Sequence, residues 1–396
     1  MKRYNPWWYS KFDIKGIIRK VYLERLEVIK NRKDIVFIVG LRRVGKTTLL
    51  YQQIIKLLDE NDSFNILYFS MDHPVLIRKS ILDILDAYRR IHGLSHTDNV
   101  TVLIDEVHLR DGFEKELKTI YDMGHVKIYA SGSSSIFLLQ KGAFLTGRQR
   151  NIEVFPFSFN EYLEIKEINI KPGDEQLLIK YAEDYVRDGG LPEYLKTNDP
   201  EYITNLIDSV VYKDVAGRHS VSNVGLLKDM MVLLSQSLGG RISTRKIGRV
   251  LGTSHETVSK YLSYFEETNL INLIEKDGKA SERKSSPRKI YLTDTGIGYT
   301  LTPSVNLGSL VENCVFNELR KEGEVRYGIH NGKEIDFITQ NKIFEVKYKN
   351  AIDPEEIKHL DKLRIKKRKY VITKGAKGDI GKIRLLPLYE FLIDGY

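Results

Sequence analysis

The segment GLRRVGKT at 40–47 constrains the fold of this chain more than any other stretch. It matches the pattern G-x-x-x-x-G-K-[ST] and follows a continuous apolar run, DIVFIVG at 34–40, which is typical of a strand buried on both faces. The residues that follow, KTTLLYQQIIKLLDE at 46–60, have the apolar spacing of a helix. A strand, a glycine-containing loop and a helix in this order are the context in which the pattern holds phosphate.

The residue types of this loop predict how a nucleotide would be held. Gly40 and Gly45 would let the backbone curl around the phosphates, so that N–H groups and the helix N-terminus face the anion. Lys46 would reach the β- and γ-phosphates of ATP, and Thr47 would bind Mg²⁺. The alternative is a glycine-rich turn with a lysine that caps a helix. The residues predicted to bind the nucleotide are Gly40, Arg43, Val44, Gly45, Lys46, Thr47 and Thr48.

Short apolar runs alternate with amphipathic stretches from residue 34 to residue 134, which predicts a parallel sheet with helices on both faces. One of these runs, VLIDE at 102–106, ends in two acids, and we expect them at the carboxyl edge of the sheet. Asp105 would hold Mg²⁺ through water. Glu106 would polarise the attacking water, which predicts ATP hydrolysis rather than a kinase reaction.

Two further positions are predicted to serve this reaction. Ser131 follows the next strand, where a polar side chain could orient water against the γ-phosphate, although a serine that caps a helix is the alternative. In LTGRQR at 145–150, which we expect to end a helix-like stretch, Arg148 and Arg150 are candidates for a finger that stabilises transition-state charge. We favour Arg148, acting within the chain or from a neighbouring subunit of a homo-oligomer. A surface salt bridge is the alternative.

The composition restricts the location and the partners. The 62 Lys and Arg residues exceed the 53 Asp and Glu residues, and the net charge of +9 favours a polyanionic partner without requiring one. A single cysteine, Cys314, excludes an internal disulfide. The chain has no apolar run of membrane-spanning length, and its first residues, MKRYNPWWYS, lack the apolar core of a signal peptide. We therefore expect a cytoplasmic protein that does not associate with membranes.

Residues 241–271 have the pattern of two helices that meet at a turn. Gly252 would lie in the turn, and Ser243 and Ser254 are good N-caps. A charged segment and a strand at 289–294 would then form a wing, so that the region predicts a winged helix that contacts nucleic acid through phosphates. A winged helix that only packs against other domains is the alternative. The basic residues expected on the wing are Lys276, Lys279, Arg283, Lys284, Arg288 and Lys289.

The segment NGKEIDFITQNKIFEVKYK at 331–349 would place acids on two neighbouring strands. Side chains alternate along a strand, so Glu345 and Lys347 share one face, and Asp336 lies on the preceding strand. Asp336 and Glu345 could supply oxygen ligands for Mg²⁺ or Mn²⁺, and Lys347 could orient water or stabilise the developing charge. Glu312, from a helix at 307–319, would add another acid. The alternative is a cluster of ion pairs in a domain that only binds DNA.

The chain resembles the archaeal-type AAA-like ATPases in an ordered set of motifs: GLRRVGKTTLL, IDEVH, SGSSS, GR, FPFSFNEYL at 155–163 and GGLPEYL at 189–195. The resemblance runs from about residue 19 to the end of the chain. It implies an α/β fold with a P-loop NTPase parallel sheet, a helical lid, a winged helix-turn-helix and a C-terminal α/β domain similar to PD-(D/E)XK (restriction-endonuclease-like) nucleases. The domains expected are a lead-in at 1–30, the ATPase core at 31–160, the lid at 161–228, the winged helix at 229–300 and the nuclease-like domain at 301–396.

Together these features predict a Mg²⁺-dependent ATPase that binds DNA and couples its nucleotide state to a metal-dependent nuclease domain. Two alternatives stay open: an ATP-switched DNA-binding regulator with an inactive nuclease-like domain, and an ATP-dependent remodeller of protein partners. Hydrolysis of ATP would use Glu106, Ser131 and Arg148. Cleavage would use Glu312, Asp336, Glu345 and Lys347.

Overall fold

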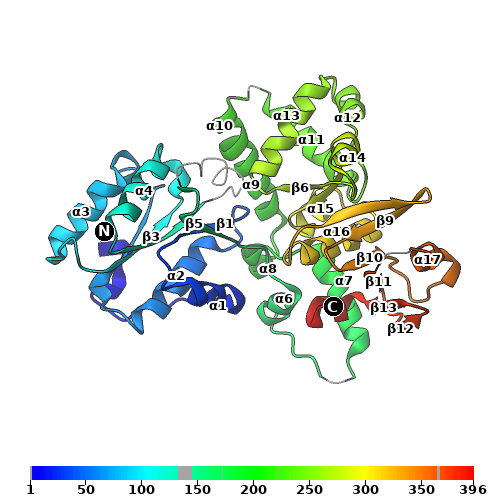
Figure 1. The fold of residues 1–396 in the computed structure, drawn as a ribbon, viewed down its shortest axis with the longest axis horizontal. Helices are drawn as coiled ribbons and strands as arrows, with labels where there is room; N and C mark the ends of the chain where they lie inside the picture. The colour runs from blue at the N-terminus through cyan, green and yellow to red at the C-terminus, as the bar shows by residue number, and fades with distance from the viewer. Residues whose placement is uncertain (1, 133–144, 172, 222, 364–365) are drawn as a thin grey trace. The chain divides into compact units, whose positions relative to one another are not determined.

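The computed structural model describes residues 2–132, 145–171, 173–221, 223–363 and 366–396 (Figure 1). The chain divides into two compact units. One unit holds Met1–Phe155 and Glu267–Asn269, and the other holds Pro156–Glu266 and Leu270–Tyr396. The division of the second unit into a lid, a winged helix and a C-terminal domain stays a prediction.

The first unit contains a five-stranded sheet in the order β2-β3-β4-β1-β5, and every pair of neighbours is parallel. The strands are β1 (Ile35–Val39), β2 (Ile66–Ser70), β3 (Val100–Asp105), β4 (Val126–Ser131) and β5 (Gln149–Glu153). The helices are α1 (Lys20–Ile29), α2 (Lys46–Leu58), α3 (Ile81–His92) and α4 (Phe113–Met123). Figure 1 shows α1 and α2 on one side of the sheet and α3 and α4 on the other. Right-handed crossovers require this arrangement of α2, α3 and α4, which connect the strands. This confirms the expected alternation of strands and helices.

The lead-in before α1 covers the edge of this sheet. The side chain of Asn5 pairs with the backbone of β2, donating to the Tyr68 carbonyl at 2.9 Å and accepting from the Tyr68 N–H at 2.7 Å. The indole N–H groups of Trp7 and Trp8 both donate to the carbonyl of Ile66, at 3.2 and 2.9 Å. These contacts occupy backbone groups that an edge strand would otherwise offer to another chain.

Strand β5 begins at Gln149, inside the stretch 145–150 that we expected to end a helix, and it pairs with β1 in the register Ile35 to Gln149. Residues 146–148 form a turn before it. The helix-like stretch expected before residue 145 falls on residues 133–144, which lie outside the described residues, so it stays a prediction. The serines at 133–135 lie outside the described residues.

The helices expected at 155–230 are present at the start of the second unit. They are α6 (Phe159–Ile165), α7 (Glu175–Asp188), α8 (Pro192–Thr197), α9 (Pro200–Ser209), a π-helical segment (Val210–Ala216), α10 (Gly217–His219) and α11 (Val224–Gln236). Between α7 and α8 the N–H of Gly190 donates to the buried carboxylate of Asp294 at 2.7 Å. Gly189 has φ +73°, and a Cβ there would lie 2.1 Å from Asp294 Oδ1, so the turn requires glycine.

Helices α12 (Thr244–Leu251) and α13 (His255–Glu267) form the expected helix-turn-helix. The Ser243 and Ser254 hydroxyls accept from the N–H groups of Lys246 and Thr257 at 3.3 and 3.2 Å, and Gly252 ends α12 with φ +64°. These contacts confirm both N-caps and the turn. Strands β6 (Ile271–Ile274) and β7 (Lys289–Leu292) then pair antiparallel, with α14 (Ala280–Ser285) between them.

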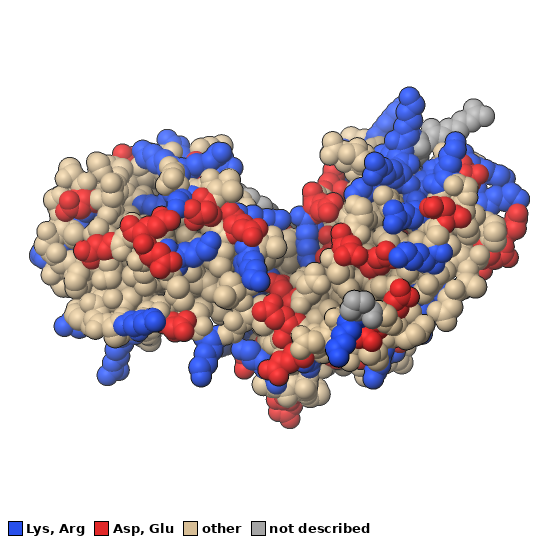
Figure 2. Space-filling view, turned by 90° about the horizontal axis from the view of Figure 1, so that it is seen from below, with Lys and Arg blue, Asp and Glu red and all other residues tan. Residues whose placement is uncertain are grey.

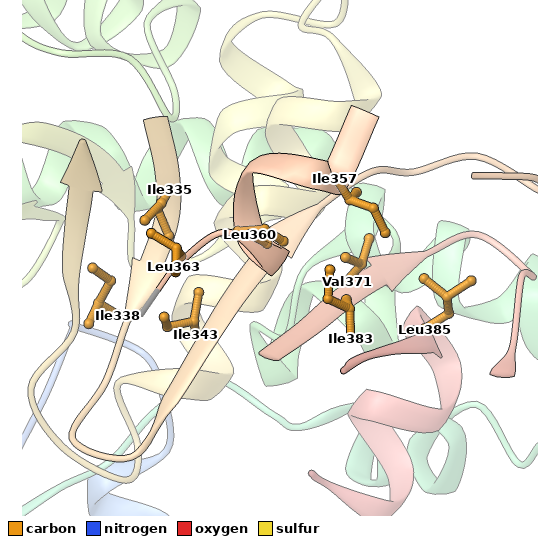
Figure 3. Close-up of a cluster of buried hydrophobic side chains, with 9 residues drawn as sticks. All are labelled: Ile335, Ile338, Ile343, Ile357, Leu360, Leu363, Val371, Ile383 and Leu385. Atoms are coloured by element: carbon orange, nitrogen blue, oxygen red, sulfur yellow. The ribbon is translucent and has the colours of Figure 1, made fainter. Parts of the chain in front are cut away.

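The remaining chain forms a mixed six-stranded sheet in the order β12-β13-β11-β10-β9-β8. Its strands are β8 (Arg326–His330), β9 (Lys333–Ile338), β10 (Lys342–Val346), β11 (Arg368–Thr373), β12 (Gly378–Ile380) and β13 (Ile383–Pro387). The helices of this region are α15 (Thr295–Leu301), α16 (Leu307–Leu319), α17 (Pro354–Asp361) and α18 (Leu388–Asp394). Figure 3 shows the core between α17 and the sheet, where apolar side chains of the helix and of four strands point toward one another.

Helix α17 is shorter than the 353–367 expected. The ammonium of Lys369 donates to the carbonyls of Asp361 and Leu363, at 3.4 and 3.0 Å, and so satisfies carbonyl groups where the helix ends. Leu363 packs into the core shown in Figure 3.

Candidate functional site

The phosphate loop connects the carboxyl end of β1 to the start of α2. Gly40 and Gly45 have φ of +145° and +94°, and a Cβ at Gly40 would lie 2.4 Å from the Val154 carbonyl oxygen. Both positions therefore need glycine. The helix begins at Lys46, and N–H groups of a first helical turn have no partner within the helix. The loop and the helix start thus have the arrangement that suits an anion.

The side chain of Lys46 lies within the loop. It is 5% exposed, and its ammonium donates to the carbonyls of Gly40 and Leu41 at 3.2 and 2.9 Å. The loop therefore holds this charge at the place where the sequence predicts the β- and γ-phosphates.

Three predicted residues of the ATP site meet at the carboxyl edge of the sheet. The Thr47 hydroxyl donates to Asp105 Oδ2 at 2.7 Å, and the Ser131 hydroxyl donates to Asp105 Oδ1. Tyr68, which the sequence did not single out, donates to Oδ2 at 3.2 Å, and burial together with the Asp105 charge raises the pKa of its phenol. A hydroxyl and a carboxylate are hard oxygen ligands, so Thr47 and Asp105 fit Mg²⁺.

Glu106 directly follows this cluster. Its backbone lies in the left-handed region, with φ +51°, and its N–H donates to the Ser131 hydroxyl at 3.1 Å. A residue other than glycine in this conformation is uncommon and is found at functional sites. The carboxylate lies 3.4 Å from Nδ1 of the buried His108. Glu106 thus lies at the same edge of the sheet as the phosphate loop.

Arg148 does not reach this site within the chain. Its carbonyl accepts from the N–H of Ile35, at the beginning of β1, whereas the phosphate loop follows the end of β1. The length of β1 separates the two by about 16 Å. The guanidinium lies 3.5 Å from Asp122, and Arg150 pairs with Asp34 at 2.5 Å. A finger from Arg148 in the same chain is therefore wrong, because β5 starts at the opposite edge of the sheet. A finger acting on a neighbouring subunit stays a prediction.

Arg19, which the sequence analysis did not single out, also contacts the loop. Its guanidinium is buried and donates to the carbonyls of Val44, in the phosphate loop, and Phe155, at 3.2 and 2.9 Å. The Tyr22 hydroxyl accepts from the N–H of Phe155 at 2.9 Å. The available signal was the place of this arginine in the sequence, after two isoleucines and before an amphipathic helix. An arginine that is buried in such a place needs carbonyl or carboxylate partners.

The second unit brings together the acids and the lysine of the predicted nuclease-like centre. Asp336 Oδ2 accepts from the Val346 N–H at 2.8 Å, and Lys347 donates to Glu345 Oε1 at 2.8 Å. Burial, with the charges of Glu345 and Glu312, raises the pKa of Asp336 well above its usual range. Burial opposes ionisation of Glu345, but His359 and the Lys347 ammonium outweigh it and lower its pKa.

Lys289 also lies in this centre, and its predicted place on the outer surface of the wing is wrong. It is 1% exposed, and its ammonium lies 2.7 Å from Glu312, 2.9 Å from Glu334 and 3.8 Å from Asp336. The strand β7 explains the difference, because alternate residues of a strand share a face. Tyr291, two positions on, donates to Glu312 at 2.7 Å.

A metal ion held by Asp336 and Glu345 does not fit this arrangement. Carboxylate oxygens suit Mg²⁺ and Mn²⁺, but the Lys289 ammonium already lies among Glu312, Glu334 and Asp336. Within the residues that the structure describes, no group of three or more His, Cys, Asp or Glu side chains is placed to hold a metal. The metal site that the sequence predicts at this centre therefore disagrees with the arrangement of these side chains.

Basic side chains are exposed along the helix-turn-helix and the hairpin after it. They are Arg241, Arg245, Lys246, Arg249, Lys260, Lys279, Lys284 and Arg288. Two of them form ion pairs, Arg241 with Glu334 and Arg288 with Glu266. On the face drawn in Figure 2, basic and acidic side chains are interspersed, and Lys and Arg gather at the upper right. Within the described residues, no helix combines the length and the apolar composition that a membrane span requires.

The fold and the phosphate loop together define a P-loop ATPase-like domain. A family model described as "AAA domain" matches residues 32–163, which cover this sheet and its loop. Two models described as domains of unknown function follow, DUF8612 at 179–307 and DUF4143 at 307–391.

Related chains extend the similarity over most of the sequence. An uncharacterised protein of Methanocaldococcus jannaschii is 29% identical over 368 residues, which cover 86% of this chain and 79% of that one. An uncharacterised protein of Haemophilus influenzae is 28% identical over 348 residues, which cover 84% of this chain and 86% of that one.

Solved structures align less closely. AMPPCP-bound DnaA from Aquifex aeolicus gives a TM-score of 0.30 at 16% identity, over 65% of this chain and 90% of that one. Drosophila ORC bound to AT-rich DNA and Cdc6 gives a TM-score of 0.27 at 14% identity, over 72% of this chain and 89% of that one. Scores this low carry no argument about this chain, and the assignment rests on the loop, the sheet and the AAA domain match.

Proposed function

We propose that this chain is a Mg²⁺-dependent ATPase whose nucleotide state regulates binding of DNA by the helix-turn-helix and its hairpin. The observation that carries the proposal is the contact of Thr47 and Ser131 with Asp105, next to a phosphate loop with left-handed glycines. These groups supply what phosphoryl transfer to water needs: a cradle for phosphates, ligands for Mg²⁺ and a neighbouring base.

Each residue has a separate role in the proposed reaction. Lys46 and the N–H groups of the loop would bind the phosphates, and Thr47 and Asp105 would hold Mg²⁺, which supplies charge neutralisation when bound. Glu106 would orient and polarise the attacking water. The Ser131 hydroxyl accepts from the Glu106 N–H and donates to Asp105. It would therefore fix the positions of the base and the metal ligand relative to each other.

ATP binding and hydrolysis by two variants test the first half of the proposal. We expect Lys46→Ala to lose both, because the ammonium would contact the phosphates already in the ground state. Glu106→Gln should keep binding and lose hydrolysis by about 100-fold or more, because it removes the base alone. Lys56→Ala, on the exposed face of α2, is the control. Unchanged turnover in Lys46→Ala would contradict the ATPase assignment.

Binding of a short DNA duplex tests the second half. The exposed basic residues of α12, α13 and the hairpin support phosphate contacts, which release counterions and make affinity depend on salt. We expect the double variant Lys246→Ala/Arg249→Ala to bind more weakly and to show a shallower salt dependence than Lys358→Ala, a control on α17. Fluorescence anisotropy from 50 to 200 mM salt measures both. If DNA does not bind, remodelling of protein partners becomes the favoured function.

Cleavage of DNA by the acidic centre is the second candidate function, favoured by the meeting of Asp336, Glu345 and Lys347. Supercoiled plasmid and linear single- and double-stranded DNA would be incubated with Mg²⁺ or Mn²⁺, with and without ATP. Wild type would be compared with Lys347→Ala and Asp336→Ala. Cleavage by wild type alone would support an ATP-coupled nuclease, whereas no cleavage, or equal cleavage by all three, would leave a regulator with an inactive domain.

A further inference from the structure

The ammonium of Lys289 lies where the acidic centre would hold a cation. The side chain comes from β7 and is 1% exposed, with its nitrogen 2.7 Å from Glu312 and 2.9 Å from Glu334. A buried ammonium persists only where carboxylates surround it. Glu312 of α16 and Glu334 of β9 therefore already share the positive charge of the Lys289 ammonium.

The surroundings of Glu312 direct its oxygens toward β7. Tyr291 and Lys289 both donate to Glu312 Oε1, at 2.7 Å each. On the other side, a Cβ at Gly239 would lie 2.9 Å from Glu312 Oε2, so this carboxylate packs against backbone that lacks a side chain. Arg241 donates to Glu334 as well. Both acids are thus bound by groups on or beside β7.

We propose that Lys289 is a built-in cation that takes the place of a divalent metal at this centre. Its charge holds Glu312, Glu334 and Asp336 together, and the centre binds a metal only when Lys289 is removed. A metal at Asp336 and the ammonium 3.8 Å away would repel each other strongly in a buried environment, so one excludes the other. The inference is independent of the ATPase activity proposed above, and it is incompatible with metal-dependent cleavage of DNA by this centre, the second candidate function.

Binding of Mn²⁺ to the full, nucleotide-free chain tests this exclusion. The bound ions would be counted from the electron paramagnetic resonance signal of free Mn²⁺ in wild type, Asp336→Asn, Lys289→Met and Lys289→Met/Asp336→Asn. We expect wild type and Asp336→Asn to bind equally. Lys289→Met should bind one additional ion, and Asp336→Asn should remove that ion again. Lys279→Met, which changes an exposed lysine of the same hairpin, should match wild type.

Thermal unfolding gives an independent readout. In EDTA, Lys289→Met should unfold at a lower temperature than Lys279→Met, because three acids lose their counter-charge. Mn²⁺ should raise the unfolding temperature of Lys289→Met and leave that of Lys289→Met/Asp336→Asn unchanged.

Two results would overturn the proposal: a Mn²⁺ ion bound by wild type and lost in Asp336→Asn, or a folded Lys289→Met that gains none. Circular dichroism reports whether that variant folds. If it does not fold, the comparison of wild type with Asp336→Asn decides alone, since equal binding supports the proposal and loss of an ion refutes it.

Discussion

Single residues in this chain derive their roles from the partners that the fold gives them. Lys46 and Lys289 are both buried lysines, but carbonyls of a glycine-containing loop hold one and carboxylates hold the other. The carbonyl groups that contact Lys46 carry no net charge, whereas the acids around Lys289 neutralise its ammonium. The same residue type therefore suits a phosphate site in the first unit and a closed ion cluster in the second.

Gly189 offers a prediction at this scale. We expect Gly189→Ala to lower the free energy of unfolding, because its Cβ would lie 2.1 Å from Asp294 Oδ1 at φ +73°. Gly332→Ala is the matched control, since it has φ +76° with no atom within 4 Å of the Cβ. The backbone conformation alone should cost about 1 to 2 kcal/mol at Gly332. Urea unfolding should show at least twice that loss of stability for Gly189→Ala. Equal losses in the two variants would show that the Asp294 side chain moves to make room for the added methyl group.

Among the elements, the lead-in and α1 do more than precede the sheet. Asn5, Trp7 and Trp8 cover the edge strand β2, and Arg19 connects the phosphate loop to Phe155, where the first unit ends before Pro156. Because the guanidinium donates to one carbonyl in each segment, its position depends on both.

Arg19→Ala tests this connection. Two buried carbonyls would lose their donor, so we expect stability to fall by about 2 to 3 kcal/mol and the KM for ATP to rise. Tyr22→Phe removes the neighbouring hydrogen bond to the Phe155 N–H without touching the loop. It should therefore lower stability and leave KM near that of wild type. An equal change of KM in both variants would contradict a specific connection between Arg19 and the phosphate loop.

For the whole molecule, a finger from Arg148 would make the number of subunits part of the mechanism. Arg148 lies at the edge of the sheet opposite the phosphate loop, so it could stabilise the transition state only in another subunit. A mixture of Lys46→Ala and Arg148→Ala distinguishes the two cases. If the finger acts between subunits, each variant alone should be inactive or nearly so, and the mixture should recover part of the wild-type hydrolysis. Full ATPase activity of Arg148→Ala alone would show that Arg148 only forms a surface ion pair and has no part in hydrolysis.

Elements with local signals could be predicted from the sequence. The phosphate loop, the alternating strands and helices of the first unit and the caps at Ser243 and Ser254 depend on neighbours along the chain, so periodicity and spacing were sufficient. Features that depend on contacts between distant segments became visible only in the folded chain. Strand β5 exists because β1 pairs with it, which moves Arg148 away from the phosphates. Lys289 is buried because β7 faces α16 and β9, and no local pattern distinguishes a lysine that meets buried acids from one that meets water.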